Sequence, residues 1–184
     1  MEKEIEVRIY SIASSLTESI VFLEEVHGIR IIPIWIGPVE AQAIAMKMSG
    51  SVSPRPMTHD LLYRIIYQTG MKVEKIVIDE LQHNTFFAKI YLLKDDDKAI
   101  AIDSRPSDAI ALAVRCGCKI YIKSSIFDMV QPITKPISEE EVKEFKERIK
   151  NFRTPKDILQ DQPSKEDKDT GKREGNNDQK TDNP

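Results

Sequence analysis

Two short segments of the chain combine groups that can bind and activate a phosphate ester. Residues 53–60, Ser-Pro-Arg-Pro-Met-Thr-His-Asp, and residues 103–108, Asp-Ser-Arg-Pro-Ser-Asp, each place an Arg-Pro pair before a helical pattern. A hydroxyl and a carboxylate follow in the first turn of each helix. Backbone N–H groups at a helix start have no partner within the helix and attract anions. An arginine beside them offers two parallel donors that match phosphate or carboxylate.

The first corner contains Arg55, Thr58, His59 and Asp60. Histidine exchanges protons near neutral pH, and a nearby carboxylate can hold its tautomer or bind a metal. Adjacent helical residues point about 100° apart, so His59 and Asp60 need not act on the same group. A structural interpretation also accounts for these residues, with Thr58 as the N-cap and Asp60 complementing the helix dipole.

The second corner contains Asp103, Arg105, Ser107 and Asp108. Because proline disfavours helical geometry in the residue before it, Arg105 is predicted to stand at the helix boundary. Asp108 then occupies the third helical position, from which it can reach back to a backbone N–H. The structural alternative is an Asp–Arg ion pair that only fixes this strand-to-helix corner. Glu40, in the first turn of an earlier predicted helix, is a further candidate carboxylate.

Together these groups suit the hydrolysis of a phosphodiester, if the fold brings them together. Carboxylates with one histidine can hold Mg²⁺ or Mn²⁺ and position water for in-line attack, although the spacing alone does not demand a metal. The expected catalytic residues are His59, Asp60, Asp103 and Asp108. The expected metal ligands are Glu40, Asp60, Asp103 and Asp108, with His59 as a general base or a further ligand. The expected phosphate-binding residues are Arg55, Arg105, Thr58 and Ser107.

Length and composition suit one soluble domain with a sizeable core, since the 184 residues are 40% apolar and 31% charged. No apolar run approaches the roughly 20 residues of a membrane helix, and no signal segment opens the chain, so we expect a cytoplasmic protein. The net charge of −3 lacks the basic character of a typical nucleic-acid-binding domain. A polyanionic partner therefore requires a local basic patch or bridging metal ions.

The only two cysteines, Cys116 and Cys118, lie too close together to form a disulfide framework. Two thiolates without further ligands at suitable spacing are also a poor zinc signature. We expect both to pack as small apolar residues.

Hydrophobic periodicity predicts an α+β fold with a mixed, largely antiparallel sheet and three or four helices. Residues 4–9 alternate as a strand, and apolar runs 19–26 and 29–36 flank His27-Gly28 as a hairpin, with Pro33 at a sheet edge or bulge. Further strands are expected at 71–81, 85–93, 99–102 and 119–122. Helices are expected from Pro38 to near Gly50, from Thr58 to Gly70 and from Pro106 to Cys116.

The chain is predicted to divide into three parts. Residues 1–135 form the α+β domain, and residues 136–160 form a charged amphipathic helix that begins with a capping box at Ser138 and Glu141. Residues 161–184 contain no aliphatic, aromatic, Met or Cys residue. Such a segment cannot offset the entropy lost on folding, so we expect a disordered polar tail.

Four segments in order resemble the bifunctional nuclease family. They are residues 32–37 with Glu40, 54–62, 84–88 and 103–111, and the resemblance extends over about residues 4–133. It implies an α+β domain that forms a homo-oligomer, with the nuclease activity on DNA and RNA attributed to some members. The residue roles above come from chemistry and not from this resemblance.

The leading hypothesis is a metal-assisted nuclease that hydrolyses DNA, RNA or both. The alternative is a non-catalytic regulatory protein whose two corners hold a small anion or an acidic segment of a partner. In a third interpretation, both corners are only architectural. The three differ in whether Arg55 and Arg105 open into one shared, solvent-accessible site.

Overall fold

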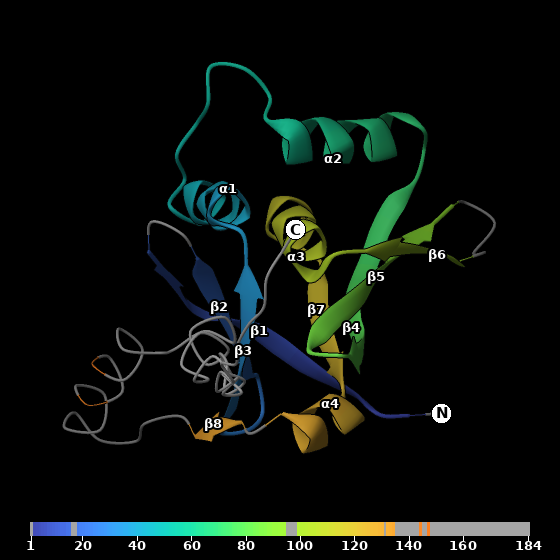
Figure 1. The fold of residues 1–184 in the computed structure, drawn as a ribbon. Helices are drawn as coiled ribbons and strands as arrows, with labels where there is room; N and C mark the ends of the chain where they lie inside the picture. The colour runs from blue at the N-terminus through green and yellow to red at the C-terminus, as the bar shows by residue number, and fades with distance from the viewer. Residues whose placement is uncertain are drawn as a thin grey trace, which may run out of the picture. The chain divides into compact units, whose positions relative to one another are not determined.

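The computed structural model describes residues 2–15, 18–94, 99–130 and 132–134, together with Glu144 and Glu147. The strands within these ranges are β1 (Glu4–Ser14), β2 (Ser19–Glu25), β3 (Arg30–Ile36), β4 (Lys72–Gln82), β5 (Thr85–Leu93), β6 (Ala99–Ser104), β7 (Lys119–Lys123) and β8 (Ile133–Thr134). The helices between residues 38 and 129 are α1 (Pro38–Met48), α2 (Thr58–Gln68), α3 (Pro106–Cys116) and α4 (Ser124–Met129). The predicted α+β class is confirmed (Figure 1).

All eight strands form a single mixed sheet in the order β6-β5-β4-β7-β1-β2-β3-β8. Every neighbouring pair is antiparallel except β4 and β7. Because β7 follows α3, the chain crosses one face of the sheet before β7 enters between β4 and β1. A parallel neighbour requires such a crossover, whereas the antiparallel pairs β2–β3 and β4–β5 are joined by short turns.

The hairpin expected around His27-Gly28 is confirmed, because β2 and β3 are antiparallel neighbours. Their register runs from the pair of Ser19 with Ile36 to the pair of Glu24 with Ile31. Among the described residues, β8 pairs with β3 only at Arg30 and Ile31. Pro33 therefore lies at an open edge, where its missing N–H costs no sheet hydrogen bond.

Helices α1, α2 and α3 lie together on one side of the sheet (Figure 1). Helix α3 contacts both α1 and α2, and α1 and α3 each pack directly on strands. Residues 109–113 of α3 are all buried against the strands and the neighbouring helices. Each fully buried Leu or Ile contributes about 1.5–3 kcal/mol, so this packing holds α3 firmly. Small residues at the helix contacts, including Ala41 and Ala43 of α1, let the helix backbones approach closely. As a result the first turns of all three helices are fixed to one core.

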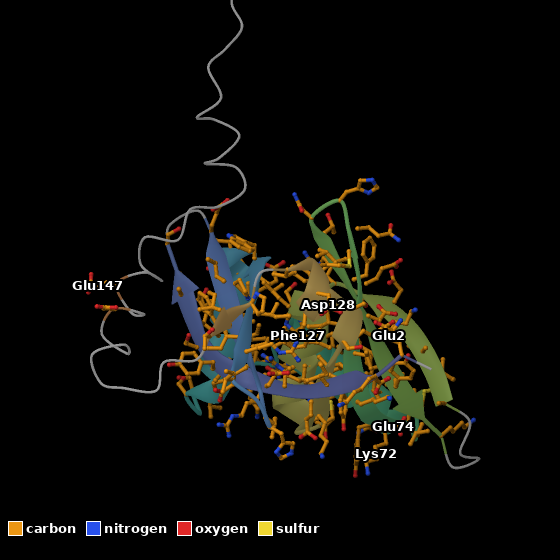
Figure 2. All side chains as sticks on the ribbon, turned by 90° about the horizontal axis from the view of Figure 1, so that it is seen from below. Glu2, Lys72, Glu74, Phe127, Asp128 and Glu147 are labelled. Carbon is orange, nitrogen blue, oxygen red and sulfur yellow. The ribbon has the colours of Figure 1, made fainter. Side chains whose placement is uncertain are left out.

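Helix α4 covers the opposite side of the sheet, below β4 and β7, and its Ile126 and Phe127 are buried (Figure 2). Its six residues are too few to show helical periodicity, and the sequence did not predict it. The predicted helix at residues 136–160, apart from Glu144 and Glu147, and the predicted tail lie outside the described residues. Across the ranges that the structure describes, no helix has the length and apolar character to cross a membrane.

Candidate functional site

Four of the predicted site residues meet where α1, α2 and α3 begin. The guanidinium of Arg105 binds Glu40 through Nη1 at 2.9 Å and Asp108 through Nε at 2.7 Å and Nη2 at 3.2 Å. The Oδ1 atom of Asp108 also lies 3.0 Å from Nε2 of His59. We call Glu40, His59, Arg105 and Asp108 the Arg105 cluster.

Local sequence explains how each member of the cluster is placed. Pro106 is the first residue of α3, which makes Arg105 the N-cap, as predicted, with extended backbone angles (φ −67°, ψ 145°). Asp108 occupies the third helical position, also as predicted. Its carboxylate accepts from the Arg105 side chain and not from a backbone N–H, which is the Asp–Arg ion pair of the structural alternative. A flexible guanidinium with two donors outcompetes a single neutral N–H for this carboxylate.

The charge on Asp108 determines which ring nitrogen of His59 carries the proton. Burial raises the pKa of Asp108, but hydrogen bonds from Arg105 and His59 outweigh it and hold this pKa below its usual value. An ionised carboxylate only accepts hydrogen bonds, so Nε2 of His59 must be the donor. In the neutral ring the lone pair then lies on Nδ1. The His59 side chain is 12% exposed, whereas that of Arg105 is 66% exposed.

The position of the Glu40 carboxylate depends on Gly37, the residue that precedes α1. A Cβ atom placed on Gly37 would overlap the carboxylate of Glu40, so a glycine leaves the space that this carboxylate occupies. Pro38 begins α1 and puts Glu40 in its first turn, as expected. The carboxylate is thereby directed to Arg105, across the gap between the starts of α1 and α3.

Asp60 lies outside the cluster and has a different partner. Its Oδ1 accepts a hydrogen bond from Nε of Arg115 at 2.6 Å, and its Oδ2 accepts one from the backbone N–H of Met57 at 2.9 Å. Burial raises the pKa of Asp60, but these two donors outweigh it and lower the pKa overall. Met57, and not Thr58, is the N-cap of α2, because the carbonyl of Met57 accepts the N–H of Leu61.

A basic hollow opens on the Asp60 side of α2, with a volume of about 350 Å³. Its charged lining consists of Lys47, Arg55, Arg64, Arg115 and Asp60. Tyr63 and the segment 51–56 complete the walls. The local basic patch that the acidic net charge requires of a polyanion-binding protein is therefore present.

The sequence analysis identified Arg55 and Asp60 in this hollow and missed the other three cations. Arg64 lies four residues after Asp60, a spacing that places both on one helix face and could have been recognised. Lys47 and Arg115 stand in the last turns of α1 and α3, where cations are common for electrostatic reasons and do not point to a site.

The two Arg-Pro corners do not open into one shared site, because they lie on different sides of the first turn of α2. Arg105 binds in the cluster with His59, whereas Arg55 lines the hollow with Asp60. Arg55 is exposed and has no ion pair or hydrogen bond with any residue that the structure describes.

Asp103 lies neither in the Arg105 cluster nor in the basic hollow. It stands opposite Lys89 in the β5–β6 ladder, and the Lys89 side chain binds Asp79 at 2.6 Å. Directly opposed residues share a sheet face, and the alternate positions Ala88 and Ile90 face the core under α3. Asp103 therefore points away from the Arg105 cluster.

The two hydroxyls of the predicted phosphate-binding set also lie in different surroundings. Ser107 is buried, whereas Thr58 is exposed. Their predicted roles in phosphate binding stay predictions.

The predicted carboxylates do not converge as a metal centre. Within residues 2–15, 18–94, 99–130 and 132–134, no three His, Cys, Asp or Glu side chains are grouped to hold a metal ion. Arg105 binds Oε1 of Glu40 and both oxygens of Asp108. Arg115 binds Oδ1 of Asp60, and the backbone N–H of Met57 binds its Oδ2. The requirement for Mg²⁺ or Mn²⁺ stays a prediction.

The chain is an α+β domain in which a His–Asp–Arg cluster and a basic hollow lie at the first turn of α2. Residues 21–135 match the family model described as the bifunctional nuclease domain. The chain belongs to this family, as the resemblance of its motifs predicted. The matched range includes the Arg105 cluster and the hollow.

Several relatives resemble the chain over different lengths. The uncharacterized protein Rv1829 of Mycobacterium tuberculosis is 35% identical over 153 residues, which cover 77% of this chain and 91% of that protein. Bifunctional nuclease 1 of Oryza sativa subsp. japonica is 31% identical over 75 residues, 40% of this chain and 23% of that protein. Bifunctional nuclease 2 of Arabidopsis thaliana is 29% identical over 94 residues, 50% of this chain and 29% of that protein. The match therefore covers less than a third of each of these plant proteins.

Proposed function

We propose that this protein hydrolyses phosphodiester bonds of DNA or RNA at the Arg105 cluster. The observation that carries the proposal is the 3.0 Å contact between Nε2 of His59 and Oδ1 of Asp108, beside the exposed guanidinium of Arg105. A proton acceptor, a group that orients it and a cation for phosphate thus occur together. The family and its plant members named as nucleases favour nucleic acid as the substrate.

Each member of the cluster has a role in this reaction. Nδ1 of His59 accepts a proton from water as the water oxygen attacks phosphorus, and the bond to the leaving oxygen breaks. Asp108 holds the required tautomer and stabilises the imidazolium that forms, as a carboxylate does in related catalytic pairs. Arg105 stabilises the negative charge that develops on the phosphate oxygens. Glu40 positions the guanidinium of Arg105 for this contact.

The proposal is tested by cleavage of fluorescently labelled single-stranded DNA and RNA by the purified protein. A general base contributes about 10²–10⁴-fold, so His59→Ala should lower kcat by that factor. The matched control is His27→Ala, which changes an exposed histidine in the β2–β3 turn and should leave kcat unchanged. Circular dichroism checks that both variants are folded.

Two outcomes would contradict the assignment. Equal cleavage by the wild type and His59→Ala would point to a contaminating nuclease. Binding of oligonucleotides without turnover would favour the alternative of a non-catalytic anion-binding protein, which the exposed, unpaired Arg55 also suits.

Repeating the assay with Mg²⁺, Mn²⁺ or EDTA tests the predicted metal requirement. The expected cytoplasmic location and homo-oligomer likewise stay predictions.

A further inference from the structure

We propose that the basic hollow binds a second phosphate of the same nucleic-acid strand, which flanks the phosphate hydrolysed at the Arg105 cluster. This inference rests on the proposed function and specifies its substrate. The protein then acts on strands of several nucleotides in preference to isolated phosphodiesters. Lys47, Arg55 and Arg64 become the residues that select such strands.

The charges of the hollow favour an anion. Asp60 neutralises Arg115, whose side chain is only 4% exposed. Lys47, Arg55 and Arg64 are exposed and form no ion pair with the described part of the chain. These three cations around one concave surface, in a chain of net charge −3, make this a local centre of positive potential.

The shape and chemistry of the lining suit a phosphate with part of its sugar. The volume of about 350 Å³ lies within the range of small-ligand sites. The two arginines Arg55 and Arg64 provide the paired donors that match phosphate oxygens.

The position of the hollow relative to the cluster sets the length of the strand. His59 and Asp60 are consecutive in α2, and their side chains contact Asp108 and Arg115 on α3. These two α3 residues are seven positions apart, which corresponds to about 10 Å along the helix. Along a base-stacked strand, which rises about 3.4 Å per nucleotide, that length corresponds to roughly three nucleotides. A strand crossing the first turn of α2 can therefore occupy both sites.

The experiment compares two charge-matched double variants. Arg55→Ala/Arg64→Ala removes two cations of the hollow, and Lys72→Ala/Lys94→Ala removes two exposed cations that do not line it. Binding of a phosphorothioate oligonucleotide, which resists hydrolysis, is measured by fluorescence anisotropy at several salt concentrations. Cleavage is measured with an unmodified oligonucleotide and with bis(p-nitrophenyl) phosphate, which carries a single phosphate.

We expect the hollow variant to bind the oligonucleotide at least about tenfold more weakly. Loss of one phosphate contact should reduce the slope of log Kd against log salt by about 0.7. KM for oligonucleotide cleavage should rise by a similar factor, while hydrolysis of bis(p-nitrophenyl) phosphate stays unchanged. The lysine variant should match the wild type. Arg55→Glu should weaken binding further than Arg55→Ala, because repulsion is added to the lost contact.

The two proposals fail in different ways. Equal oligonucleotide affinity of the hollow variant and the lysine variant would overturn the second-phosphate site, even if cleavage still depends on His59. Weaker binding by the hollow variant in a protein that cleaves neither substrate would support the site and reject the nuclease assignment. An equal loss of activity on both substrates would place Arg55 and Arg64 at the cleavage centre and would also overturn the inference.

Discussion

Arg115, in the last turn of α3, donates a hydrogen bond from Nε to Oδ1 of Asp60, in the first turn of α2, at 2.6 Å. The same guanidinium donates to the carbonyls of Ala111 in α3 and Ala43 in α1. One buried cation thus joins three helices, and Asp60 supplies its counter-charge. This contact fixes the first turn of α2 over α3 and places His59 next to Asp108.

We predict that Asp60→Asn destabilises the protein because it leaves the buried guanidinium of Arg115 without a counter-charge. Charged hydrogen bonds contribute about 1.5–3 kcal/mol, and partial exposure of Asp60 places the loss near the lower end, at about 1–2 kcal/mol at pH 7. Urea denaturation measures the change. Asp103→Asn is the control, since Asp103 is exposed on β6, and its unfolding free energy should equal that of the wild type.

The effect of Asp60→Asn should depend on pH. Because the folded pKa of Asp60 is lowered, its stabilisation is fully present above the unfolded value of about 3.9. This stabilisation is lost as the pH falls through the lowered folded pKa. The denaturation midpoints of the wild type and the variant should therefore converge in acid. A constant difference down to pH 2 would mean that the Asp60 charge does not stabilise the fold.

We predict that Asp108→Asn lowers kcat strongly and changes KM little. Without the ionised carboxylate, His59 is no longer held in the tautomer protonated at Nε2. A loss of about 10²-fold or more is expected, comparable with removal of the general base. In ¹⁵N NMR spectra the wild type should show a protonated Nε2, and the variant should show a changed ratio of tautomers. A wild-type ring protonated at Nδ1 when neutral would contradict the proposed role of His59.

Gly37→Ala should act through Glu40, because the added Cβ overlaps that carboxylate and displaces it from Arg105. We expect reduced activity with little change in stability, since Arg105 is exposed and surface ion pairs contribute at most about 1 kcal/mol. A double-mutant cycle with Glu40→Ala tests whether Gly37→Ala lowers activity through Glu40. The double variant should be no less active than Glu40→Ala alone, and additive losses would show that Gly37 acts independently of Glu40.

Cys116 should react rapidly with alkylating agents. The sequence analysis expected small apolar packing residues, and both cysteines do pack against the core, but they are only half-buried. A hydrogen bond from the Cys118 thiol lowers the pKa of Cys116 to about 7. The rate of iodoacetamide modification should therefore be half-maximal near pH 7. Cys118→Ala should move this midpoint towards about 8.5, and an unchanged midpoint would contradict the role of Cys118.

We predict that the expected homo-oligomer forms through β6. This strand ends the sheet in the part of the chain described by the structure, and its Ile100 and Ile102 are 43% and 44% exposed. An apolar edge strand favours pairing with another chain. Ile102→Lys should shift the mass measured by light scattering towards the monomer. Ile29→Lys, in the β2–β3 turn, is the control, and a monomeric wild type would reject the oligomer.

Local signals in the sequence were sufficient to predict most of the fold. The bounds of α3 agree with the prediction, because Pro106 begins the helix and Gly117 adopts a left-handed φ of 72° after its end. The strands predicted at 71–81 and 85–93 correspond to β4 and β5, and His83 and Asn84 between them adopt the positive φ angles of a tight hairpin turn. Helix α4 was missed because one and a half turns give too little periodicity.

By itself the sequence determined the elements and the residue types at the helix starts, because caps, turns and periodicity act over a few neighbouring positions. Only the tertiary structure decided the partners of those residues. His59 and Asp108 meet across 49 positions, and Asp60 and Arg115 across 55. These contacts depend on how α2 packs against α3, a long-range result of core burial. The same packing separates Asp60 from the Arg105 cluster although it follows His59 directly in the chain.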